Sequence, residues 1–125
     1  MLSELEHDVL GTVTLGPEAM AEWEGIHIIY RLARYVFPEV KFSDVVEALV
    51  KLLNMNYVEC QLEEYISKPI TQVTKEDILD LYGGYLTEED IKIYPREPVY
   101  AFRATAKGRE EYANSTYDIY RPWKQ

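Results

Sequence analysis

The sequence predicts a single α+β domain that spans residues 1–125, and two observations lead to this prediction. Three segments with apolar residues at helical spacing come first, and two strand-like segments and a closing helix follow them. A chain of 125 residues buries roughly two thirds of its unfolded surface on folding, which is enough for one core. No repeat, low-complexity tract or linker divides the chain.

The first helix is predicted to begin at about Ser3. Ser3 and Glu6 have the spacing of a capping box, in which each residue satisfies a backbone amide of the other. Gly16 and Pro17 predict the end of this helix, because glycine accepts the positive φ of a C-terminal cap and proline opens a new helix more readily than it continues an old one. A turn is therefore expected at this point.

A second and a third helix are expected between this turn and Asn54. Apolar residues recur at intervals of three and four over residues 17–37, which predicts a long amphipathic helix. Gly25 is unfavourable inside it, so the helix is open to a split there, and Pro38 predicts its end. Ser43 is the expected N-cap of the third helix, whose broad apolar face predicts that it is mostly buried.

Strands are expected at residues 57–62 and 98–103. The first alternates so that Val58, Cys60 and Leu62 share one face, and the second is rich in strand-forming residues. Thr105 is the expected cap of a last helix. The segment between the strands, at about 63–97, is predicted to be an insertion with a short helix that begins near Thr74, ends at Gly83-Gly84 and is followed by a turn at 87–90.

Three stretches of the chain resemble winged helix-turn-helix domains of the PadR and MarR types. "EALVKLLNMNYVEC" (47–60) is similar to the second helix of the motif and the first wing strand, and "YAFRATAKGREEY" (100–112) is similar to the second wing strand and the helix after it. "DVLGTVTLGPEAM" (8–20) resembles the first helix and Gly-Pro turn of PadR-type regulators. The resemblance implies a winged-helix-like fold with three N-terminal helices, a small antiparallel β wing with an inserted helical element, and a C-terminal helix.

The resemblance also implies that the third helix reads DNA, but the charge of the chain disfavours this. The net charge is −9, and the polar stripe of that helix (Asp44, Glu47, Lys51 and Asn54) has two acids and one base, which a phosphate backbone repels. Candidate contacts to nucleic acid or another anion are Arg31, Arg34, Lys51, Arg103, Lys107 and Arg109. A scattered, solvated surface is the favoured interpretation of these cations, and a single basic patch is the alternative.

The C-terminal segment is the best candidate for a partner interface. The chain has eleven tyrosines, and tyrosine is enriched at protein interfaces. The candidate interface residues are Tyr112, Tyr117, Tyr120 and Trp123. They either fold back onto the domain or contact a protein partner or a second copy. The leading hypothesis is a non-enzymatic macromolecule-binding domain that binds protein or itself. A DNA-binding transcriptional regulator is the first alternative, and a small acidic inhibitor or immunity-type protein is the second.

No motif predicts catalysis, a cofactor or a membrane segment. The nucleophile elbow, the phosphate-binding loops and the Cys-x-x-Cys pair are all missing from the sequence. Cys60 is the only cysteine and is expected to be a buried, unreactive thiol. Glu4, His7 and Asp8 have weak metal-site spacing, although an exposed acidic helix is the favoured interpretation. With no signal peptide and no apolar span, we expect a cytoplasmic protein.

Overall fold

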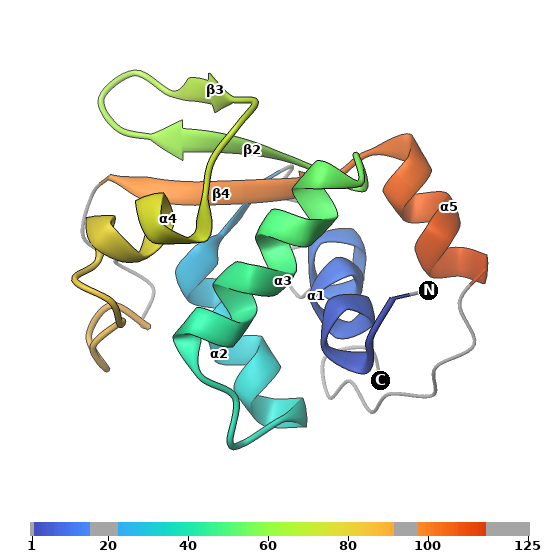
Figure 1. Cartoon of the computed structure of the whole chain (residues 1–125), viewed down its shortest axis with the longest axis horizontal. Coiled ribbons are helices and arrows are strands. Elements are labelled where there is room, and N and C mark those ends of the chain that lie inside the picture. Colours follow the sequence, from blue (N-terminus) through green and yellow to red (C-terminus); the bar gives the residue numbers. More distant parts are fainter. Residues whose placement is uncertain (1, 16–22, 92–97, 115–125) are drawn as a thin grey trace.

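The computed structural model describes residues 2–15, 23–91 and 98–114 and has an α+β fold (Figure 1), which confirms the predicted class. The helices are α1 (Glu4–Leu15), α2 (Ile26–Val36), α3 (Phe42–Asn54), α4 (Lys75–Leu81) and α5 (Ala106–Asn114). The strands are β1 (Glu24–Gly25), β2 (Val58–Glu63), β3 (Lys68–Ile70) and β4 (Val99–Ala104). Among the described residues, no helix is long and apolar enough to cross a membrane.

The four strands form one antiparallel sheet in the order β1-β4-β2-β3. Cys60 on β2 lies opposite Phe102 on β4, and both side chains are buried. Because side chains alternate between the two faces of a strand, Val58 lies on the same face as Cys60. Helices α1, α2 and α3 pack against the sheet, and α5 follows at the end of β4 (Figure 1). The two predicted strands are thus confirmed.

Helix α3 is the central element of the core. It lies between α1 and α4 and also contacts α2 and β2 (Figure 1). The side chains of Val45, Val46, Leu49 and Leu52 are completely buried. Burying one side chain of this size contributes roughly 1.5–3 kcal/mol to folding, so this apolar face is a main source of stability. The prediction that the third helix is mostly buried is confirmed.

Helix α1 has the predicted capping box but not the predicted exposure. The Ser3 amide donates to Glu6 Oε1 at 3.0 Å, and the Glu6 amide donates to Ser3 Oγ at 3.1 Å. Glu6, His7 and Asp8 are all buried. The interpretation of this segment as an exposed acidic helix is therefore wrong. The physical reason is that α1 contacts α2, α3, α5 and β4, so little of its circumference is left to solvent.

The second helix is shorter than the apolar spacing predicts. Glu24 and Gly25 form strand β1, which pairs with Phe102 and Ala101 of β4, and α2 begins only at Ile26. Pairing with β4 holds this segment in extended backbone geometry, with Gly25 at φ −68° and ψ 146°. The expectation of one long helix from Pro17 is thus wrong at residues 24–25, and the interruption lies at Gly25, where a split was considered. The Gly16-Pro17 turn lies outside the described residues.

The third helix begins one residue before the predicted cap. Helix α3 starts at Phe42, and the Lys41 amide donates to Asp44 Oδ2 at 3.0 Å. Ser43 is therefore inside the helix, and the prediction that it is the N-cap is wrong. An aspartate at this position stabilises the start of the helix because it accepts from the amide of the capping residue and places a negative charge at the positive end of the helix dipole. At the other end, Asn56 has φ 63°, as expected of an asparagine that ends a helix.

The described part of the insertion, residues 63–91, packs into the same core as the rest of the described chain. It contains β3, α4 and a turn at 88–91, and it buries Ile78, Tyr82 and Leu86. Thr74 caps α4 by accepting from the Asp77 amide at 3.1 Å, and Gly83 and Gly84 have positive φ after its end, which confirms the predicted helix. The hydroxyl of Tyr82 accepts from the Tyr100 amide of β4 at 3.0 Å. This bond fastens the insertion to the sheet.

Helix α5 begins with the predicted cap. Thr105 Oγ1 accepts from the Gly108 amide at 3.0 Å and donates to the Asn56 carbonyl at 2.7 Å. Gly108 packs directly against the backbone of Tyr57. The ring of Tyr112 stacks on that of His7, with centroids 4.7 Å apart. The start of α5 is therefore fixed to the end of α3, and its second half is fixed to α1.

Candidate functional site

The exposed face of α3 has the four residues predicted from the sequence. Asp44, Glu47, Lys51 and Asn54 are all exposed. The Lys51 ammonium lies 3.1 Å from Glu6 of α1, and Glu47 lies 3.2 Å from Lys75 of α4. The lone cation of this face is thus already paired with a carboxylate. The ion pairs also link α3 to both of its neighbouring helices.

A groove of about 220 Å³ lies between α1 and α3. It is lined by Ser3, Leu5, Glu6, Asp44, Glu47, Ala48 and Lys51. The lining has three carboxylates and one ammonium group. Burial raises the pKa of Glu6, but hydrogen bonds from the Ser3 amide and Lys51 lower it, and the net effect is a lowered pKa. Glu6 is thus held as an anion, so the groove is acidic.

Three of the predicted cations lie away from α3's exposed face. Arg103 Nε lies 2.8 Å from Glu59 and its guanidinium lies over the Trp23 ring at 4.3 Å. Because Phe102 faces the helices, Arg103 lies on the other face of the sheet. At the end of α3, Lys107 Nζ donates to the Met55 carbonyl at 3.1 Å. Arg109 donates to the Ala104 carbonyl at 3.0 Å, so all three are bound by local partners.

Arg31 and Arg34 are brought together at the opposite end of the molecule. Both lie on α2, whose last turn leads through a short loop to the start of α3, whereas Lys107 contacts the residue that follows α3. A helix of 13 residues is about 20 Å long, so this length separates Arg31 and Arg34 from Lys107. The six cations therefore do not form one patch in the described part of the chain.

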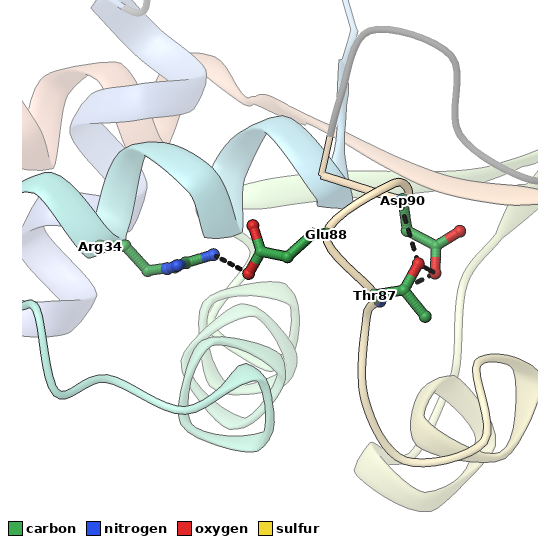
Figure 2. A network of polar contacts seen from close by, with 4 residues as sticks. All are labelled: Arg34, Thr87, Glu88 and Asp90. Carbon is green, nitrogen blue, oxygen red and sulfur yellow. Dashed lines mark hydrogen bonds and ion pairs between the residues drawn. The ribbon is translucent and has the colours of Figure 1, made fainter.

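A cavity of about 460 Å³ lies between α2 and the turn at 88–91. Its lining residues are Arg31, Arg34, Tyr35, Pro38, Glu88 and Ile91. Figure 2 shows Arg34 reaching from α2 toward Glu88 of the turn, with 3.4 Å between Nη1 and Oε1. The side chain of Glu88 is 81% exposed, so this ion pair is largely solvated and contributes little to stability.

The turn that forms the far wall of this cavity is itself well fixed. Asp90 Oδ2 accepts from the Thr87 amide at 2.9 Å and from its hydroxyl at 2.7 Å (Figure 2), and Thr87 Oγ1 accepts from the Asp90 amide. Asp90 and Ile91 are buried, which anchors the turn beside α2. The predicted turn at 87–90 is confirmed. Glu88 is thus presented from a rigid segment.

His27 is buried one helical turn before Arg31. Its ring packs on Gly25, where a Cβ would lie 2.5 Å from His27 Cε1, and its Nδ1 has no hydrogen-bond partner among the described residues. Burial lowers the pKa of His27 to about 4, and the positive charge of Arg31 lowers it while the negative charge of Asp90 opposes this. The imidazole is therefore neutral at physiological pH.

The described residues offer little for nucleophilic or metal chemistry. Cys60 is buried, and burial raises its pKa to about 12, so the prediction of a buried thiol is confirmed. Within residues 2–15, 23–91 and 98–114 there is no group of three His, Cys, Asp or Glu side chains able to hold a metal ion. His7 stacks on Tyr112 instead.

The turn between β2 and β3 is an exposed apolar feature that the sequence analysis missed. Tyr65 is 99% exposed and Ile66 is 67% exposed. The sequence signal for this feature was a pair of adjacent apolar residues in a segment without helical or strand periodicity. Of the predicted interface, Tyr112 is half-buried against His7, whereas Tyr117, Tyr120 and Trp123 lie outside the described residues.

Comparisons of the chain with protein-family models, with curated proteins and with solved structures found no match.

Proposed function

We propose that this chain is a winged-helix-like domain that binds another protein or a second copy of itself and does not catalyse a reaction. The order of its elements supports the first part. Helices α1, α2 and α3 precede β2, and β4 pairs with β2 before α5 closes the chain. In this interpretation β2 and β4 are the wing strands, and β3 and α4 belong to an insertion between them.

The exposed pair Tyr65 and Ile66 is the observation that carries the proposed protein binding. The two side chains project from the tip of the β2–β3 hairpin, which extends away from the helices in Figure 1. Transferring such apolar surface out of water favours association by about 25 cal/mol per Å². Neither residue makes a hydrogen bond within the described chain. A partner that covers this tip would therefore gain apolar burial without displacing polar contacts.

The charge of α3 argues against DNA as the partner. Groove-reading helices donate hydrogen bonds to bases and phosphates, which requires free cationic or amide donors. On α3 the Lys51 ammonium is paired with Glu6, so among the described residues Asn54 is the available side-chain donor of this face. The Asp44 carboxylate beside it would repel phosphate groups, and Glu47 is paired with Lys75. The tip of the β2–β3 hairpin, which belongs to the insertion, has Glu64 beside Tyr65 and so does not offer a basic surface to DNA either.

Light scattering over a concentration series tests this proposal. We expect a mass above that of the monomer at high concentration, and we expect Tyr65→Ser/Ile66→Ser to shift the mass toward the monomer. Tyr85→Ser is the control, because it removes a tyrosine that is 62% exposed at another place. A monomer at every concentration would restrict the proposal to a different protein as partner.

A duplex-binding experiment separates the proposal from the DNA-binding alternative. Fluorescence anisotropy of a labelled mixed-sequence duplex at low salt is expected to stay constant. Binding at about 10⁻⁶ M that weakens steeply with added salt would overturn the proposal in favour of a transcriptional regulator.

A further inference from the structure

The cavity between α2 and the turn at 88–91 has a charge opposite to that of the chain. Among the described residues that line it, the ionisable ones are Arg31, Arg34 and Glu88, which is two positive charges and one negative charge, or +1. The chain as a whole has −9. Buried Asp90 of the same turn adds a negative charge nearby, because it acts on His27 one helical turn before Arg31. The attraction for an anion therefore comes from the two guanidinium groups themselves.

We propose that this cavity docks an acidic side chain of a partner protein, flanked by an aliphatic one. The carboxylate lies between the guanidinium groups of Arg31 and Arg34, and the aliphatic neighbour lies on Tyr35, Pro38 and Ile91. This inference rests on the proposed protein binding and names the chemistry of the partner. It concerns a surface separate from the hairpin tip.

The state of the two arginines supports a carboxylate ligand. Arg31 makes no hydrogen bond or ion pair with the described residues, although it is only partly exposed. Arg34 contacts Glu88 at 3.4 Å, which is long for a charge-assisted hydrogen bond. A guanidinium group binds carboxylates through two parallel N–H donors, and donors of both arginines remain available for such a bond.

The rest of the lining fits the aliphatic neighbour. Ile91 is 5% exposed and forms part of the lining, whereas Tyr35 is 63% exposed and stands at the surface. A volume of about 460 Å³ is within the roughly 300–1,000 Å³ that ligand sites occupy, and it accommodates an acidic side chain with an apolar neighbour.

Glu88 acts as an internal competitor in this arrangement. Its carboxylate already contacts Arg34 across the cavity, so the site accepts a group of this chemistry. Because its side chain is 81% exposed, Glu88 turns into solvent at small cost when the partner's carboxylate arrives. Removing the charge of Glu88 should therefore strengthen binding, whereas removing that of Arg31 or Arg34 should weaken it.

The experiment is a titration of the full chain followed by amide chemical shifts. The probe is acetyl-Leu-Glu-Leu-amide, and its uncharged twin is acetyl-Leu-Gln-Leu-amide. We expect saturable shifts at residues 31–38 and 88–91 with the glutamate peptide, and affinity at least about tenfold weaker with the glutamine peptide. Arg31→Gln and Arg34→Gln should each weaken the glutamate peptide by about tenfold, and Glu88→Gln should strengthen it.

Lys68→Gln is the matched control, because it removes one positive charge from an exposed strand residue that does not line the cavity. It should leave the affinity unchanged. Arg31→Lys keeps the charge but loses the two-pronged donor, and it tests the site if Arg31→Gln does not fold.

Equal affinity for both peptides, or shifts outside the cavity, would overturn the proposal. Tighter binding of inorganic phosphate than of the glutamate peptide would overturn the carboxylate assignment. Light scattering of the hairpin variants reports separately on the proposed function.

Discussion

The backbone carbonyl of Tyr57 occupies the space that a side chain on Gly108 would need. The same carbonyl accepts from the Thr105 amide at 3.0 Å, so the first turn of α5 is pressed against the segment that leads from α3 into β2. Close approach of two backbones at this point requires glycine. The contact therefore fixes where α5 sits on the domain.

Substituting Gly108 should consequently destabilise the fold. Gly108→Ala places a methyl group against a backbone carbonyl, which cannot move as a flexible side chain does. We expect a loss of about 1–3 kcal/mol in the free energy of unfolding, the usual cost of overpacking, measured by urea denaturation. Glu110→Ala on the exposed side of the same helix is the control, and it should change stability little. A Gly108→Ala variant as stable as the wild type would contradict this contact.

His27 should make the fold sensitive to acid. Its pKa is lowered from 6.5 to about 4 in the folded chain, so the unfolded chain binds the proton more readily. The contribution of neutral His27 to the free energy of unfolding is fully present above pH 6.5, and it is lost as the pH falls toward 4 and below. The loss should be roughly 3 kcal/mol between pH 7 and pH 4, by linkage of the two pKa values.

The comparison for this prediction is His27→Gln, which does not titrate. Carboxylates with lowered pKa values, such as Glu6, also lose their contribution in acid, but they do so in both proteins. The difference in unfolding free energy between wild type and variant, measured across this pH range, isolates the histidine. A difference that is independent of pH would rule out a buried neutral His27.

Glu6 has two separable roles at the start of α1. It accepts from the Ser3 amide, and it pairs with Lys51 of α3 at 3.1 Å. Glu6→Gln keeps an acceptor for the amide, so it should cost only the ion pair with the half-exposed Lys51, about 1 kcal/mol. Glu6→Ala loses both roles and should cost about 1 kcal/mol more. Equal unfolding midpoints for the two variants would show that the capping bond contributes nothing.

Cys60 should be unreactive in the folded protein. Cys60 is 2% exposed, so a reagent cannot reach the sulfur, and its pKa of about 12 keeps the group as the unreactive thiol. Ellman's reagent at pH 8 should label the chain in concentrated urea and not in buffer, because the thiolate is the reacting species. Rapid labelling in buffer would show that β2 opens readily or that the side chain faces solvent.

Most elements of the fold were predictable because their signals are local. The capping box of Ser3 and Glu6, the Thr74 cap and the Gly83-Gly84 ending each depend on residues within one or two turns. The alternation that puts Val58 and Cys60 on one face is equally local. These interactions form wherever the backbone is helical or extended, so the spacing alone reveals them.

The remaining features depend on contacts between distant segments. Strand β1 has two residues and exists because Glu24 and Gly25 pair with β4, more than seventy positions later. The burial of Asp8 likewise depends on elements that close around α1. For the candidate cavity, Arg31 and Arg34 were predicted as contacts, but Glu88 and Ile91 join them only through the packing of the insertion. The spacing of residues in the sequence does not predict such contacts between distant segments.

The edge position of β3 determines what kind of assembly the hairpin permits. Its middle residue, Pro69, has no amide hydrogen, so this strand cannot offer a complete ladder to a further strand. Lys68 beside it adds a charge that discourages edge-to-edge pairing with another sheet. A partner is therefore expected to bury Tyr65 and Ile66 through side-chain contacts and not through strand pairing with β3. Extension of the sheet by a further strand along this edge is therefore disfavoured.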